Sequence, residues 1–318
     1  MNNELWLPSV LNPIIKGATT QTERVEKIYE YLRDNVTCTR HSQLFTDESV
    51  SKIADKKRGG VAGINLLLTA MLRSAGLQAD PVVLSTRENG IVNDEYPVFR
   101  PFNYVICRVY ADGKEWLLDA SRSRLGFGRL HYDCYNGPAR VVNEEATLLT
   151  LKPDQLTERK QTSILIYNEG NGKWTGYASK LYGYYASDKL RQKMATDGKA
   201  GLLKDLIIEY GNELGIDSIR VDSLHKLDES VTVHYKMMST NEQADIIYMN
   251  PVLGERFSQN PFKSANRQYP VEIPYKLNEL YTLNMEIPDG YVVEELPTPV
   301  RLLLNKNNDG VFDYKISH

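Results

Sequence analysis

Two short patterns in this chain place a thiol three positions away from an imidazole: Cys38 with His41, and His131 with Cys134. These residue types can support thiolate catalysis or hold a zinc ion. No further pair with zinc-ligand spacing accompanies them, so we expect no metal and no cofactor. The two pairs could meet in space, although nothing in the sequence requires it.

Cysteine usage limits the other roles of the thiols. Three cysteines form an odd and sparse set, which is not a disulfide framework, although a single bridge is compatible with it. Cys107 is flanked by Val105 and Val109 in a strand-like run. We therefore expect Cys107 to be a buried apolar side chain.

Helices must position any chemistry in the first half of the chain. Residues 20–36 repeat apolar side chains at helical spacing, and Thr20 or Thr22 can cap the helix. A second helix is predicted over 61–76, where a core-facing apolar stripe follows two glycines. Such an N-terminus can bind phosphate, but no Gly-Lys-Ser/Thr and no preceding parallel strand is evident, so this signal is weak.

A hairpin is the strongest local signal. Asp112-Gly113 separates two strand-like runs at 104–110 and 115–120. If these two residues form the loop, the pairing register is determined. Tyr104 and Asp119 then share one face of the hairpin as diagonal cross-strand neighbours, roughly 7–8 Å apart.

The pattern changes after a polar stretch at 151–160. A strand pair, a helical insert at 184–211 and an alternating strand at 231–237 follow, and two further strand pairs close the chain. We therefore predict an α+β protein with two domains, 1–152 and 153–318. The second is expected to be an antiparallel β-sandwich-like domain with a helical insert.

Several of these segments resemble the transglutaminase-like superfamily, which has a papain-like cysteine-protease-type fold. The resembling stretches are GGVAGINLLL at 59–68, MLRSAGL at 71–77, PVVLSTR at 81–87, FNYV at 102–105 and WLLDAS at 116–121. In that superfamily the glycine-led helix begins with the cysteine nucleophile. The first hairpin strand supplies a histidine base, and the second supplies an aspartate that orients the histidine.

Two of these three positions are changed in this chain. The nucleophile position falls on Val61 and the histidine position on Tyr104, while Asp119 matches. Valine has no nucleophilic atom, and a phenol with a reference pKa of about 10 is a poor base at neutral pH. The resemblance therefore implies a catalytically degenerate domain, in which Asp119 bonds the Tyr104 hydroxyl or a backbone N–H.

The expected function is non-catalytic: binding of a peptide, a protein or a cell-envelope glycan, or a structural role in a larger protein. The candidate cleft residues are Gly60, Val61, Asn103, Tyr104, Asp119, Arg87, Arg108 and Arg122. An open groove beside Val61 would favour binding, and a cleft filled by Tyr104 would favour a structural role.

The alternative is an active cysteine protease or transglutaminase that uses a displaced nucleophile. If a thiol lies within hydrogen-bonding reach of a histidine in the cleft beside Tyr104 and Asp119, the non-catalytic hypothesis fails and this alternative holds.

The resemblance extends to large multidomain proteins of the Bacteroidetes type, with a β-rich N-terminal domain, this central domain and a C-terminal β-domain. Segments at 260–263, 267–271, 287–291 and 295–297 resemble that last domain. We expect the chain to lack the first domain and to stop before the final strands. The family context implies the periplasm or cell envelope, and no signal peptide is visible in the given chain.

Composition excludes two classes of partner. A net charge of −3 without a basic run argues against nucleic acid. The most apolar stretch, 64–72, is too short to span a membrane. The sequence leaves the ligand and the oligomeric state open.

Overall fold

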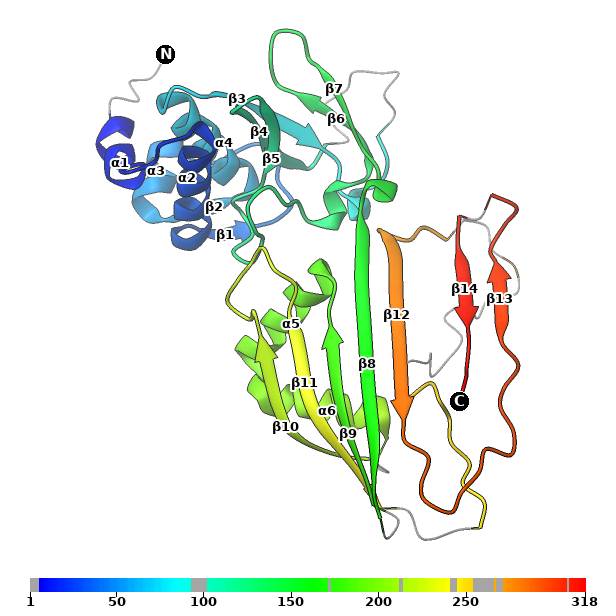
Figure 1. The fold of residues 1–318 in the computed structure, drawn as a ribbon. Helices are drawn as coiled ribbons and strands as arrows, with labels where there is room; N and C mark the ends of the chain where they lie inside the picture. Colours follow the sequence, from blue (N-terminus) through cyan, green and yellow to red (C-terminus); the bar gives the residue numbers. More distant parts are fainter. Residues whose placement is uncertain are drawn as a thin grey trace.

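The computed structural model describes residues 6–92, 102–170, 173–211, 214–240, 245–253, 266, 271–307 and 309–318. Four helices and two short strands pack beside a first five-stranded sheet, and the long strand β8 leads from there into a second five-stranded sheet (Figure 1). Within these residues no helix has the length and apolar character needed to cross a membrane.

The first four helices lie close together in Figure 1: α1 (Leu7–Ile14), α2 (Gln21–Asn35), α3 (Val50–Lys56) and α4 (Val61–Ser74). The predicted helix 20–36 corresponds to α2. Thr20 caps it in a capping box, because its hydroxyl accepts from Glu23 N and the Glu23 carboxylate accepts from Thr20 N. Asp112, in the distant hairpin loop, also accepts from Thr22 N at 2.8 Å.

A parallel strand pair that the sequence did not predict leads into α4. It consists of β1 (Thr37–Arg40) and β2 (Arg58–Gly60), and Cys38 lies opposite Gly59 in the register. Because β2 ends where α4 begins, β1 lies beside the N-terminus of α4. The pair is too short to show a period-2 pattern, so pattern reasoning missed it.

The first sheet has the order β5-β4-β3-β6-β7 with all pairs antiparallel. Its strands are β3 (Gln78–Leu84), β4 (Tyr104–Ala111), β5 (Lys114–Leu118), β6 (Gly137–Val141) and β7 (Leu148–Leu151). The predicted register of the β4–β5 hairpin is confirmed, with Ala111 opposite Lys114. Both loop residues have positive φ, 48° at Asp112 and 76° at Gly113, as a two-residue hairpin turn requires.

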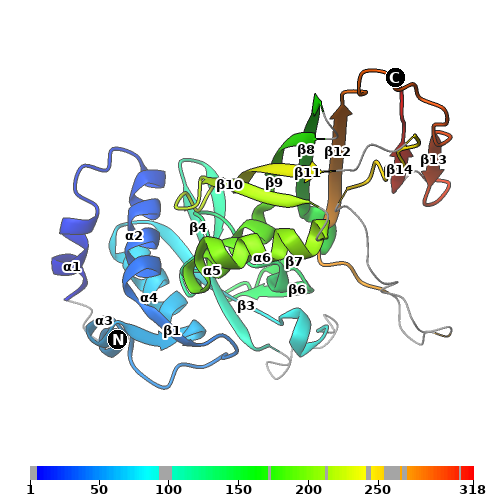
Figure 2. The ribbon, with the colours of Figure 1, turned by 90° about the horizontal axis from the view of Figure 1, so that it is seen from below.

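The second sheet has the order β10-β11-β9-β8-β12. Its strands are β8 (Thr157–Gly170), β9 (Lys173–Leu181), β10 (Gly215–Asp222), β11 (Thr232–Thr240) and β12 (Lys276–Met285). The predicted insert forms α5 (Tyr184–Thr196) and α6 (Gly198–Tyr210), which cover one face of this sheet (Figure 2). The α+β class is confirmed.

The second half differs from the expected antiparallel sandwich in two respects. β12 joins β8 in parallel, after the long connection from β11 that parallel pairing requires. Among the described residues, the helices α5 and α6 bury the apolar side of the strands, where the prediction placed a second sheet. A separate two-stranded sheet contains β13 (Val300–Leu303) and β14 (Val311–Tyr314), as predicted.

Two expectations for this half have other outcomes. The first of the two strand pairs predicted at the end of the chain was expected around Pro288-Asp289-Gly290. The described residues 291–299 contain no strand, so this pair does not form. The motif segments 260–263 and 267–270 lie outside the described residues.

Candidate functional site

The three positions of the superfamily triad meet in the structure, and all three are completely buried. Val61, Tyr104 and Asp119 each have 0% exposed surface. The Tyr104 hydroxyl donates to Asp119 Oδ2 at 2.8 Å, as the hairpin register predicted. Val61 and Tyr104 belong to one apolar cluster, which also contains Leu84 and Ile106. The space that a substrate would need beside Val61 is therefore filled by packed side chains.

Asp119 is buried with its hydrogen-bonding capacity well used. Besides Tyr104, its carboxylate accepts from Asn65 Nδ2 at 2.8 Å, from Ser121 N at 3.0 Å and from Ser121 Oγ at 2.6 Å. The side-chain oxygen of Asn65, Oδ1, accepts a hydrogen bond from Ala120 N at 2.9 Å. Together, the hydrogen bonds from Tyr104, Asn65 and Ser121 compensate for the desolvation cost of burying the carboxylate. Sequence reasoning missed Asn65, although an amide inside an apolar helix stripe was the available signal.

Tyr104 acts as a hydrogen-bond donor in this network. Burial and the negative charge of Asp119 raise the pKa of Tyr104 well above its ordinary value, so the phenol stays protonated. The hydroxyl accepts from Arg122 Nε at 3.2 Å. Burial opposes the charge of Arg122, but Tyr104 and Asp119 outweigh that effect and raise its pKa.

A polar segment covers the N-terminus of α4. A Cβ atom added at Gly60 would lie 1.6 Å from Gln43 Oε1, so the Gln43 side chain occupies the space over this glycine. Gln43 N donates to Asn103 O at 2.7 Å, and Asn103 Nδ2 donates to Ser42 Oγ at 3.0 Å. The candidate cleft residues Gly60 and Asn103 therefore contact this segment of the chain itself.

The candidate arginines occupy three different environments. Arg122 bonds Tyr104, as described above. Arg108 is buried and pairs with Asp80 at 2.8 Å, four positions along β4 from Tyr104. Arg87 pairs with Glu272 at 3.5 Å. Of these three arginines, Arg122 is the one that bonds the Tyr104–Asp119 network within the described part of the chain.

A thiol lies within hydrogen-bonding reach of a histidine near this network. Cys38 Sγ is 3.5 Å from His41 Nδ1 and also donates to Arg40 O at 3.3 Å. Cys38 is half-buried and packs against the apolar cluster that contains Val61 and Tyr104, while His41 is exposed. This contact matches the geometry that favours a displaced nucleophile, but Cys38 lies at the edge of the filled cleft.

The second thiol–imidazole pair is different. Cys134 is buried, and burial raises its pKa well above the ordinary value, while His131 Nδ1 lies 3.0 Å from Asp133. His131 is near enough to His41 for its charge to lower the pKa of His41. The described residues nevertheless contain no group of three or more metal-ligating side chains, and their three cysteines are free thiols.

A cavity of about 680 Å³ lies elsewhere, between the two halves of the chain. Its wall comes from α2, with Glu30 and Asp34, from α5, with Arg191, and from residues 224–229. Both carboxylates and cationic side chains line it. No sequence pattern indicated this cavity, because its wall combines segments far apart in the chain.

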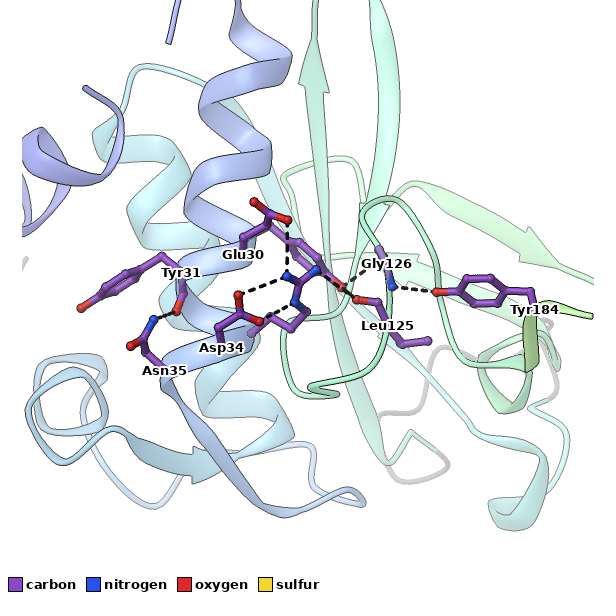
Figure 3. Close-up of polar contacts among 9 residues, drawn as sticks. Glu30, Tyr31, Asp34, Asn35, Leu125, Gly126 and Tyr184 are labelled. Carbon is purple, nitrogen blue, oxygen red and sulfur yellow. Dashed lines mark hydrogen bonds and ion pairs between the residues drawn. The ribbon is translucent and has the colours of Figure 1, made fainter. Parts of the chain in front are cut away.

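The segment after Asp119 forms polar contacts with both halves (Figure 3). Tyr29 Oη, from α2, donates to Leu125 O at 3.1 Å, and Gly126 N donates to Tyr184 Oη, from α5, at 2.7 Å. Tyr185 Oη donates to Leu130 O at 2.9 Å. Backbone groups of residues 125–130 are therefore the shared partners of both halves.

Comparison with known proteins gives two family matches. Residues 8–118 match the model of the transglutaminase-like superfamily, and residues 245–318 match a domain of unknown function with a solved structure (DUF3858). No curated protein matches the chain.

One solved structure is similar, that of a candidate protease from Parabacteroides distasonis, with 11% identity and a TM-score of 0.39. The similarity covers 76% of this chain and 50% of that one, so the chain spans about half the length of this relative. The two family matches establish that the chain contains a transglutaminase-like domain, at residues 8–118, and a DUF3858 domain, at residues 245–318.

Proposed function

We propose that the transglutaminase-like domain is non-catalytic at its family triad and serves as a structural module. The observation that carries this proposal is the complete burial of Val61, Tyr104 and Asp119. A nucleophile must reach its substrate, and a base must exchange a proton with it. Side chains without accessible surface do neither. In this proposal residues 1–152 and 153–318 are the two domains.

The Tyr104–Asp119 network also has a use in such a module. Asp119 and Arg122 both bond the Tyr104 hydroxyl. These two residues lie at the start of the segment that continues to Leu125 and Gly126. That segment contacts both α2 and α5. The network therefore holds one end of the joint between the two halves, and loss of the network should loosen the joint.

Restoring the lost residues tests this proposal. We would compare two proteins for amine incorporation and peptide hydrolysis. The first carries Cys38→Ser alone, and the second carries Cys38→Ser together with the restoring double substitution Val61→Cys/Tyr104→His. The expected result is no activity in either protein, because the restored pair would be buried, and a lower stability of the double variant. Activity in the double variant alone would show that the cleft is open to substrate. Activity without the restored residues would show that the domain is an enzyme.

A second candidate function is the binding of a charged peptide in the cavity between the two halves. Its volume, about 680 Å³, lies in the range of small-molecule and short-peptide sites, and its wall carries both signs of charge. Titration calorimetry with an alternating Glu-Lys peptide would test it. Saturable binding weakened by Asp228→Asn and Lys226→Gln would support the idea, and binding unchanged by both would refute it.

We also propose a periplasmic or cell-envelope location, which is supported by the resemblance to Bacteroidetes-type proteins. Cell fractionation of the native host, with antibody detection, is the direct test. Recovery of the protein in the cytoplasmic fraction would contradict this assignment.

A further inference from the structure

We propose that Cys38 and His41 form a thiol–imidazole pair that accepts acyl groups from thioesters and activated esters. The site is separate from the buried triad, and it does not depend on the structural role proposed above. It would make this chain a covalent acyl acceptor at a position different from the nucleophile position of the superfamily.

The position of Cys38 supports this inference. Cys38 lies opposite Gly59 in the parallel β1–β2 pair, and β2 runs directly into α4. The thiol is therefore one strand away from the helix N-terminus at which the superfamily carries its nucleophile. Gly60, the N-cap residue, provides no side-chain capping bond to this helix. The first-turn dipoles of α4 favour negative charge that develops nearby.

Access and geometry separate Cys38 from the other two cysteines. Cys107 and Cys134 are 0% and 2% exposed, whereas Cys38 is half-buried beside the exposed His41. The thiol has one proton, which it donates to Arg40 O at 3.3 Å. Because Sγ also lies 3.5 Å from His41 Nδ1, rotation of the S–H bond directs that proton to the imidazole instead. Nucleophile and base contacts are often this loose before substrate binds.

Burial, together with the charges around the pair, favours a neutral thiol and a neutral imidazole. Burial raises the pKa of Cys38, and a hydrogen bond with the backbone of Arg40 is the largest opposing effect. The carboxylate of Asp119 adds to the rise, against smaller effects of Arg122 and Ser121. His41 has exposed surface, but the surrounding protein partly desolvates its ring and so lowers its pKa. Arg122 and His131 act in the same direction, while Asp119 opposes them. At neutral pH His41 is therefore free to accept a proton, and the thiol needs this help to attack.

The acyl-transfer step balances without a further reactant. Cys38 Sγ attacks the carbonyl carbon of the donor as the S–H proton passes to His41 Nδ1. The bond from that carbon to the leaving thiol or phenol breaks, and the leaving group takes the proton from His41 directly or through water. The product is a thioester on Cys38. Such donors have good leaving groups, so the step needs less assistance than cleavage of an amide.

The test uses the full chain with p-nitrophenyl acetate as the probe. We expect intact-mass and peptide analysis to find one acetyl group, on Cys38, with Cys107 and Cys134 unmodified. Cys38→Ser and Cys38→Ala should abolish the adduct. His41→Gln should slow acylation by on the order of 100-fold at neutral pH, the lower end of a general-base effect, whereas His225→Gln, at an exposed histidine elsewhere, should not.

The pH profile separates assistance by His41 from mere exposure of a thiol. In the wild type the acylation rate should be nearly independent of pH between two ionisations. The plateau should begin where His41 loses its proton, below about pH 6.5, the ordinary pKa of histidine, and it should end where the thiol ionises. In His41→Gln the level region should disappear, and the rate should follow thiol ionisation alone. A wild-type profile identical to that of His41→Gln, or acylation at another cysteine, would overturn the proposal. Neither outcome bears on the buried triad, which the Cys38→Ser background tests separately.

Discussion

The hydroxyl of Tyr104 and the carboxylate of Asp119 are joined by a 2.8 Å hydrogen bond in a region where neither side chain has exposed surface. In the superfamily these positions hold the histidine and the aspartate that orients it. In this chain the same two positions, which share one face of the hairpin, hold a protonated phenol and a carboxylate. In the proposed structural module, this contact stabilises the fold.

Removing this hydroxyl should therefore cost stability. We expect Tyr104→Phe to lower the free energy of unfolding by about 1–3 kcal/mol, because Asp119 loses one buried donor and Arg122 Nε loses its acceptor. Urea denaturation measures the change. Tyr177→Phe, at a half-exposed tyrosine, is the matched control and should stay within about 0.5 kcal/mol. Equal effects of the two variants would contradict a structural role for the Tyr104 hydroxyl.

Asn65 should be the most sensitive polar residue of α4. Replacing it by leucine removes one donor to Asp119 and leaves Val105 O and Ala120 N without their side-chain partner. The expected loss is about 3 kcal/mol or more, since a buried carboxylate is left partly unsatisfied. Thermal and urea unfolding report it. A loss below about 1 kcal/mol would mean that water replaces the amide.

Asp112 should make stability depend on pH. Hydrogen bonds from the Thr22 side chain and backbone, and from Gln21 N, lower the pKa of this carboxyl. A lowered folded-state pKa gives a contribution that is present above about pH 4, the unfolded value, and lost as pH falls through the folded value. Wild type should therefore exceed Asp112→Asn in stability at neutral pH, and the gap should close in acid.

Asparagine suits this comparison because it tolerates the positive φ of 48° at position 112. Urea denaturation from neutral pH down to about pH 3 measures the gap. A difference between the two proteins that stays constant over this range would show that the charge of Asp112 is not responsible.

The joint between the two halves depends on residues 125–126. Gly126→Ala would place a Cβ 2.1 Å from Asp228 Oδ1 and 3.0 Å from Leu227 O, so the contact between the halves must shift. We expect this variant to open the joint, with faster proteolysis between the halves and separated unfolding transitions. Gly76→Ala is unsuitable as a control because of its positive φ, whereas Gly215→Ala meets only one atom, at 3.5 Å, and should behave like wild type. A single cooperative transition in Gly126→Ala would contradict this role.

Local sequence signals were sufficient for much of the first half. Apolar spacing and capping residues predicted α2 and α4, because helix formation depends on neighbours three or four positions away. The Asp112-Gly113 turn determined the register that brings Tyr104 to Asp119, because a two-residue loop leaves one pairing. The resemblance to the superfamily and the change of its nucleophile to Val61 could be read directly from the residues.

Only the tertiary structure decided whether the cleft is open and what surrounds it. Asn65 and Asp119 are 54 positions apart, and Cys38 lies against a cluster that contains Tyr104. Such contacts depend on how separate elements pack, and no local period encodes them. The same holds for the parallel pairing of β12 with β8 and for the joint at Gly126. The sequence by itself determined that the family nucleophile is absent, whereas packing decided that its place is filled and that the remaining accessible thiol, Cys38, lies beside a histidine.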